Sequence, residues 1–376
     1  MSTTSGAFRR PTARGRRSGT STPTRGVEPF ATLYHWDLPQ TLQDKHGGWQ
    51  LKETVKAFGD YAGTVARVLG DRIKHVFTIN EFHSFVDMGH QGIDIDMGGG
   101  KSVHIGLAPG LQLSNRDLNQ VRHHSVLAHG LAVQAIRANG PGDIKVGFAE
   151  NMQEPIPAID TPEHVKAAEA AAREQNAPYM TVMLEGRYTD AYLAGAGAEA
   201  PRFTDDELKT IATPTDFVGI NVYRPSAYIE PSDDPSGYRE LPFNESHPKM
   251  ASSWHLFDPE VMYWAPRLVH SIWGPTSIYI TENGCAALDK VAPDGRVYDS
   301  DRLMFLRTCL GALQRATAEG VPVDGYFHWS AQDNLEWTAG FGNRFGLVYV
   351  DFETLERKPK ASAAWFREAA RANAVV

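Results

Sequence analysis

The sequence predicts a parallel α/β fold, an incomplete (β/α)8 TIM barrel. Strand-like runs alternate with helical ones along the chain, which is the pattern of a parallel sheet covered by helices. Three of the six expected strands run through Asn80, Asn221 or Glu282 near their ends. Functional side chains at the carboxyl ends of strands favour a TIM barrel over a doubly wound sheet, which would need a glycine-rich first turn. Because a closed barrel of this type has eight strands, we expect about six of the eight βα units.

Each element follows from its residue pattern. Apolar residues recur at helical spacing over 51–69, and those of the expected buried stripe are Val55, Phe58, Tyr61, Ala62, Val65 and Ala66. Further helices are expected at 119–138, 160–175, 259–272, 301–319 and 362–373, and residues 83–118 have the composition of a loop. Runs rich in β-branched and aromatic residues predict strands at 30–35, 73–80, 144–149, 216–223, 277–282 and 323–329, with a short one at 347–351.

Composition indicates one large domain behind a short head. The chain has 376 residues, of which 42% are hydrophobic, enough for a full core. Residues 1–26 contain Ser, Thr, Arg, Gly and Pro with a single Phe8, and such a composition cannot bury a core. We therefore predict a disordered head over residues 1–26 and a barrel domain over residues 27–376.

Charge and cysteine content exclude several classes of protein. The net charge is −8, and six arginines lie in residues 1–26, so the rest of the chain has 31 basic against 45 acidic residues. An acidic body of this kind does not suit nucleic-acid binding. Only Cys285 and Cys309 are present and no apolar run approaches about 18 residues, so we expect no disulfide framework, no membrane span and a cytoplasmic location.

Two short segments indicate the chemistry. The segments 78–81 and 278–284 are strand-like runs, and each places a glutamate, Glu81 or Glu282, where a buried strand ends. A lone glutamate at a strand end is usually a solvated surface charge. Two carboxyl groups facing one another across a site are what glycoside hydrolysis requires, and one must be protonated while the other is ionised.

The motifs together resemble those of family 1 glycoside hydrolases, which are β-glucosidases and their relatives on a (β/α)8 barrel. The resemblance covers residues 27 to about 370, in the family's order. It is carried by Thr32-Leu33-Tyr34-His35-Trp36-Asp37-Leu38-Pro39, Thr78-Ile79-Asn80-Glu81, Asn221-Val222-Tyr223, Ile280-Thr281-Glu282-Asn283-Gly284, Trp329-Ser330, Asp333-Asn334-Leu335-Glu336-Trp337 and Arg344-Phe345-Gly346-Leu347.

The resemblance implies a role for each candidate site residue. It implies that Glu81 is the general acid/base, that Glu282 is the nucleophile and that Tyr223 hydrogen-bonds the nucleophile. The substrate would be a small-molecule β-glycoside or oligosaccharide bound without a cofactor. The residues that would hold the sugar's hydroxyls or pack on its face are His35, Trp36, Asn80, Trp329, Glu336 and Trp337.

The sequence departs from the family's pattern in three ways. The first two strands of the family are not matched, and a sugar-binding glutamine and an arginine beside the nucleophile are expected to be missing with them. The usual Asn-Glu-Pro is Asn80-Glu81-Phe82 here, and the head over residues 1–26 resembles nothing in the family. We expect an open barrel to have unpaired strand edges. A second copy of the chain could pair with such an edge, so a homo-oligomer stays open as an alternative.

No metal site is expected. His123, His124 and His129 lie on one expected helix, but the last two are five residues apart rather than four, so packing roles are the better interpretation. The main hypothesis is a retaining β-glycosidase acting by double displacement. Its alternatives are a truncated, inactive remnant and a sugar-binding protein without turnover.

Overall fold

A computed structural model describes residues 2–3, 26–96, 102–252 and 254–376. Contacts divide them into two compact units, and each unit is described by itself. The first unit holds residues 2–3, 26–152 and 173–219, and the second holds residues 153–172 and 220–376. Nearly all of the head predicted over residues 1–26 lies outside the described residues. Helix α4 (Pro162–Gln175) and strand β8 (Val218–Asn221) run from one unit into the other.

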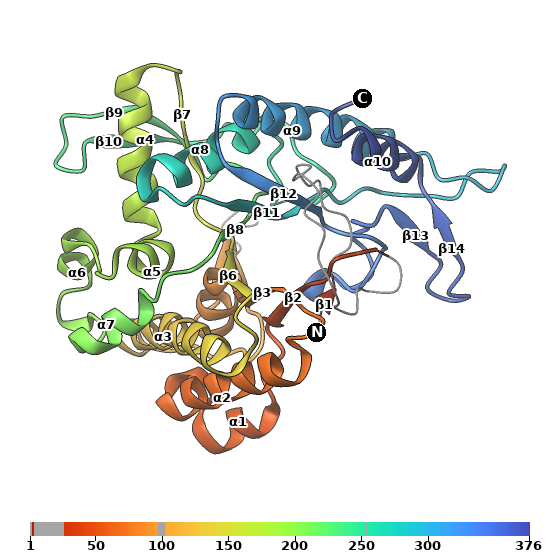
Figure 1. The fold of residues 1–376 in the computed structure, drawn as a ribbon. Coiled ribbons are helices and arrows are strands. Elements are labelled where there is room, and N and C mark those ends of the chain that lie inside the picture. Colours follow the sequence, from red (N-terminus) through yellow and green to blue (C-terminus); the bar gives the residue numbers. More distant parts are fainter. Residues whose placement is uncertain (1, 4–25, 97–101, 253) are drawn as a thin grey trace. The chain divides into compact units, whose positions relative to one another are not determined.

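The first unit is built on three parallel strands, β2 (Phe30–Tyr34), β3 (His75–Asn80) and β6 (Lys145–Glu150). Strand β3 lies between the other two (Figure 1), with His75 opposite Phe30 on one side and Lys145 on the other. All but the first residue of β3 and of β6 are buried. Parallel strands covered on both faces need apolar residues on both, which explains why these runs are continuous rather than alternating.

Two long helices of this unit, α2 (Lys52–Leu69) and α3 (Asn115–Asn139), pack against one another, and α3 contacts β3 and β6. The predicted stripe of α2 is buried except at Tyr61, which is 39% exposed. Helix α3 begins after Ser114, whose hydroxyl accepts a 3.2 Å hydrogen bond from the Asp117 amide and so caps the helix.

The prediction of an unstructured loop over residues 83–118 is wrong. A π-helical turn, η2 (Ser84–Met88), follows β3, and β4 (Ile93–Asp96) and β5 (Ser102–Ile105) form an antiparallel pair. Helix α3 also begins four residues earlier than expected, because its first turn is polar and carries no apolar periodicity. The remaining elements of the unit are β1 (Ser2–Thr3), which pairs antiparallel with β2, α1 (Gln40–His46), η1 (Gly48–Gln50), η3 (Ala177–Thr181), α5 (Val182–Glu185), α6 (Asp190–Ala196), η4 (Gly197–Glu199) and α7 (Asp205–Ile211).

The second unit is built around β11 (Ile278–Asn283) and β12 (Val323–His328), which pair in parallel. All six residues of β11 are buried. Helix α9 (Ser300–Ala318) connects the two strands and contacts both α8 (Val261–Trp273) and α10 (Ala361–Ala372), as Figure 1 shows. These strands and helices confirm the pattern predicted for the C-terminal half of the chain.

Smaller sheets complete the second unit. A three-stranded sheet has the order β10–β9–β7, and a separate pair of strands precedes α10. Within the described residues, no helix is long and apolar enough to cross a membrane. The strands are β7 (Pro155–Pro157), β9 (Ala227–Pro231), β10 (Tyr238–Leu241), β13 (Val348–Val350) and β14 (Arg357–Pro359), and a short 3-10 turn, η5, covers Trp337–Ala339.

Candidate active site

Glu81 follows the last residue of β3 and is buried, with 8% of its surface exposed. Its backbone is left-handed, with φ of 51°, which costs a non-glycine residue on the order of 1 kcal/mol or more. Its amide donates a 2.8 Å hydrogen bond to the Ala149 carbonyl, so β6 holds the point where the chain turns away from the sheet. This geometry fixes the carboxylate at the carboxyl end of the first unit's strands.

Asn80 is held by two neighbours from the turn after β2. The Trp36 indole N–H donates to the Asn80 carbonyl over 3.0 Å. The Asn80 side-chain amide lies 3.3 Å from Nε2 of His35. Burial lowers the pKa of His35 to about 4, so its ring is neutral at neutral pH and Nε2 can accept from that amide. The structure therefore brings His35, Trp36 and Asn80 together beside Glu81.

Glu282 lies in β11 and is 7% exposed. The Tyr223 hydroxyl donates a 2.9 Å hydrogen bond to Oε2 of Glu282, and the Glu282 carbonyl accepts one of 2.8 Å from the Val222 amide. A hydrogen bond donated to a carboxylate favours its charged form. The pair expected between Tyr223 and Glu282 is thus present in the second unit.

The residues behind Tyr223 were not anticipated from the sequence. Nε2 of His255 lies 2.8 Å from the Tyr223 carbonyl, which can only accept, so the ring donates. Burial lowers the pKa of His255 to about 4, which keeps the ring neutral. The Trp254 ring stacks on His255 and contacts the Tyr223 ring edge-on, 5.7 Å between centroids. These contacts fix the position of the hydroxyl that meets Glu282.

The other candidate sugar contacts follow β12. The indole N–H of Trp329 lies 3.4 Å from Oε2 of Glu336, a long hydrogen bond, and the Trp329 amide donates to the Asn283 carbonyl over 2.9 Å. Trp337, next along the chain, is 40% exposed and offers an apolar face. Trp329 and Glu336 are thus brought together, and Trp337 extends the same segment.

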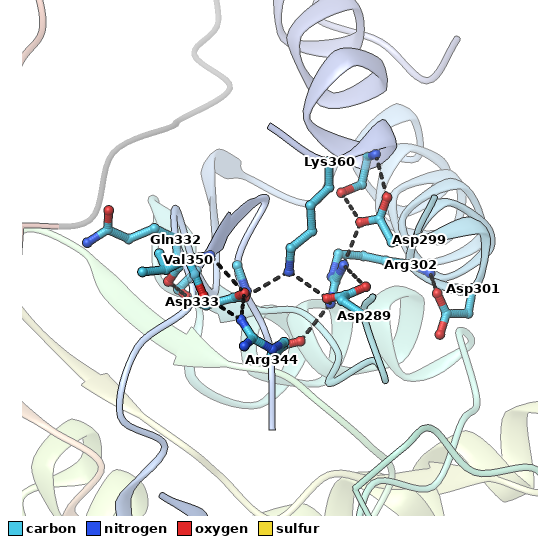
Figure 2. A network of polar contacts seen from close by, with 12 residues as sticks. Asp289, Asp299, Asp301, Arg302, Gln332, Asp333, Arg344, Val350 and Lys360 are labelled. Atoms are coloured by element: carbon cyan, nitrogen blue, oxygen red, sulfur yellow. Dashed lines mark hydrogen bonds and ion pairs between the residues drawn. The ribbon is translucent and has the colours of Figure 1, made fainter. Parts of the chain in front are cut away.

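A buried network of ions holds this segment in place (Figure 2). Asp333 accepts from Lys360 over 2.7 Å and from Arg344 over 2.6 Å. Lys360 also donates to Asp289 over 2.6 Å, and Arg302 bridges Asp289 and Asp299. Three cations meet three carboxylates, so the buried charges balance, as buried ions require. Asp333 and Arg344 lie in motifs that carry the resemblance, but the resemblance implies no role for either residue. The other residues of the network were not predicted because they lie far from these motifs in the sequence.

Glu150 is the functional candidate that the sequence reasoning overlooked. It is the last residue of β6 and is 1% exposed. Burial raises its pKa to about 8. The signal that singles out Glu81, a glutamate where a buried strand ends, was also present in the sequence at Glu150.

No three His, Cys, Asp or Glu side chains gather as a metal site within the described part of the chain. The three helical histidines make separate packing contacts. Nδ1 of His123 lies 2.9 Å from the Tyr188 hydroxyl, and the partners of His124 and His129 at Nδ1 are the Trp49 carbonyl and the Thr78 hydroxyl.

Comparison with known proteins identifies the family. The family model described as glycosyl hydrolase family 1 matches residues 20–375. The chain is 35% identical to the 1,4-β-D-glucan glucohydrolase of Thermotoga neapolitana, over 93% of this chain and 75% of that protein. It is also 35% identical to β-glucosidase A of Thermotoga maritima, over 93% of this chain and 74% of that protein.

Solved structures agree with this result. The family 1 β-glucosidase from Thermotoga maritima superposes with a TM-score of 0.79 at 33% identity, covering 93% of this chain and 75% of that one. The predicted barrel of glycosidase type, present in part, is therefore confirmed. The chain belongs to glycosyl hydrolase family 1 and is an O-glycosyl hydrolase.

Proposed function

We propose that the chain hydrolyses terminal β-D-glycosides, β-glucosides foremost, by double displacement with retention at the anomeric carbon. The support is the family membership, the relatives named β-glucosidase, and two buried carboxyl groups at strand ends in the two units. The observation that carries the proposal is the 2.9 Å hydrogen bond from the Tyr223 hydroxyl to Glu282.

In the first step, Glu282 attacks the anomeric carbon while Glu81 gives its proton to the leaving oxygen. The bond to the leaving group breaks and a glycosyl ester forms on Glu282. In the second step, Glu81 takes a proton from water, the water oxygen attacks the same carbon, and the ester bond to Glu282 breaks. Such a mechanism needs the two carboxyl groups about 5–5.5 Å apart.

The other residues act on binding and orientation in this proposal. The Tyr223 hydroxyl holds Glu282 in its charged, attacking state. Asn80 and His35 bind sugar hydroxyls near Glu81, with Trp36 fixing the Asn80 backbone. Trp329 and Glu336 bind hydroxyls in the second unit, and Trp337 packs its exposed face against the sugar's C–H groups.

A mechanism-based label tests the proposal. A 2-deoxy-2-fluoro β-glucoside with a good leaving group should form a stable ester, because the fluorine slows the second step. Mass spectrometry of the digested protein should place the added mass on the peptide with Glu282, and the Glu282→Gln variant should take no label. A label on another residue would overturn the assignment of the nucleophile.

The alternatives give different outcomes of the same experiment. A chain that takes no label but binds a glucose-shaped iminosugar in calorimetry is a sugar-binding protein without turnover. A chain that neither takes the label nor binds the iminosugar is an inactive remnant.

A further inference from the structure

Three consecutive backbone amides at the end of β3 donate to the end of β6. The amide of Glu81 donates to the Ala149 carbonyl over 2.8 Å. The next two, of Phe82 and His83, donate to Oε2 and Oε1 of Glu150 over 2.6 and 3.2 Å. One buried carboxyl group therefore uses both oxygens to hold the two residues that follow Glu81.

This arrangement depends on the residue at position 82. The resemblance places a proline there, and proline has no N–H to donate. A proline also drives the residue before it out of the helical region toward an extended backbone. Phe82 supplies the amide that Glu150 accepts and permits the φ of 51° at Glu81. Phe82 itself is fully buried.

We propose that Glu150 is a positioning residue for Glu81, holding its backbone through the amides of Phe82 and His83. The inference rests on the acid/base role proposed for Glu81. A non-glycine residue stays left-handed only where its surroundings impose that conformation, and Glu150 supplies two of the three amide contacts that do so here.

The surroundings of Glu150 keep it uncharged. Burial is the main cause of its raised pKa, and the carboxyl group of Glu81 raises it further, whereas His83 lowers it. Glu150 therefore keeps its proton below about pH 8, and it holds the two amides without adding a second negative charge beside Glu81. The other titratable groups that bear on this pair are Asp87 and Arg122, which act on His83, and Tyr179, which interacts with Glu150.

The Glu150→Gln variant tests the inference. Glutamine keeps the shape but has one oxygen, so its NH2 group would face one of the two amides. The kcat/KM of an alkyl β-glucoside, whose first step needs the proton of Glu81, should fall at least about tenfold, while the kcat/KM of a dinitrophenyl β-glucoside should stay within about threefold. Glu163→Gln, at an exposed site in the first turn of α4, is the matched control and should change neither rate.

A second measurement does not depend on turnover. In chain labelled with 13C-glutamate, the carboxyl signal of Glu81, assigned with Glu81→Gln, should shift and broaden in Glu150→Gln, because a carboxyl group whose backbone is no longer held samples more than one environment. Circular dichroism would show that the variant is folded. A parent chain without hydrolysis or label refutes the proposed function, and the carboxyl signal of Glu81 still decides on Glu150. Equal losses on both glycosides, or an unchanged Glu81 signal, would overturn the positioning role.

Discussion

The Tyr223 hydroxyl donates a 2.9 Å hydrogen bond to Oε2 of Glu282, and the same two segments are joined again through the backbone, where the Val222 amide donates to the Glu282 carbonyl. The backbone bond keeps the two segments in register, so the donor and the carboxylate separate only when a side chain rotates or β11 moves. A hydroxyl held in this way is pre-organised to stabilise the negative charge of Glu282, which must persist until the carboxylate attacks.

Removing that hydroxyl should weaken catalysis and shift its pH dependence. Tyr223→Phe deletes a hydrogen bond to a charged group, worth about 1.5–3 kcal/mol, so kcat/KM should fall by about 10- to 100-fold. The acidic limb of the pH–rate profile should move to higher pH, because the ionised carboxylate loses a donor. Tyr298→Phe, at a site that is 54% exposed, is the control and should leave both unchanged. An unmoved acidic limb in Tyr223→Phe would contradict the role.

The proposed acid/base can be recognised by its dependence on the leaving group. Glu81→Ala should slow the first step of hydrolysis of an alkyl β-glucoside by about 100-fold or more. The first step with a dinitrophenyl β-glucoside should slow far less, since only the alkyl leaving group needs a proton. Azide should restore turnover of the activated substrate and give a β-glycosyl azide, because a small anion can replace the carboxylate that otherwise activates water. Steady-state kinetics and product analysis check both. Equal losses on the two substrates and no azide adduct would exclude the role.

Glu150 should make stability depend on pH in a definite direction. Its pKa is raised from an ordinary value of 4.5 to about 8, so between these pH values the unfolded chain has released a proton that the folded chain keeps. Its contribution therefore favours folding below pH 4.5 and declines by up to about 1.4 kcal/mol per pH unit as the pH rises toward 8.

Urea unfolding at several pH values measures this effect. As the pH rises from 5 to 8, the free energy of unfolding of Glu150→Gln should increase relative to that of the parent, because glutamine does not ionise. Glu163→Gln should run parallel to the parent. A difference between Glu150→Gln and the parent that does not change with pH would show that Glu150 is already ionised in the folded chain.

Breaking the buried ion network should destabilise the second unit. Lys360→Met leaves Asp289 and Asp333 each without one cation, and an uncompensated buried charge costs about 3–5 kcal/mol. Denaturant unfolding should show that loss. The control is Glu368→Gln at a half-exposed ion pair with Arg371, which should cost less than about 1 kcal/mol. A loss in Lys360→Met as small as that of the control would mean that the network contributes little.

The sequence sufficed for the long helices and the central strands of the two units because their signal is local. The continuous apolar runs of β3 and β11 show a strand buried on both faces, and the stripe of α2 shows the face of a packed helix. The β4–β5 pair was missed because Ile93–Asp96 and Ser102–Ile105 are only four residues long each, although polar and apolar residues alternate in both as in a half-exposed strand. Its pairing is made by backbone hydrogen bonds, which leave little trace in side-chain pattern.

The candidate site was predictable only where a motif remained recognisable. Glu81, Tyr223 and Glu282 lie at strand ends in recognisable segments, whereas His255 reaches Tyr223 through a backbone carbonyl across 32 residues. Contacts of that kind follow from the fold and not from spacing. Glu150 is an intermediate case, because its position at a strand end was visible but its partners are the amides of Phe82 and His83.

The buried ion network has a consequence for motion. Loops that carry ligand-binding groups are commonly the first parts of a protein to open. Here the amides of Gly346 and Val350 donate to Asp333, which also binds Lys360 and Arg344, so opening the segment around Glu336 would hydrate all of these ions at once. Hydrogen exchange at those two amides should therefore need cooperative unfolding of the second unit, and the segment behaves as core rather than as a lid.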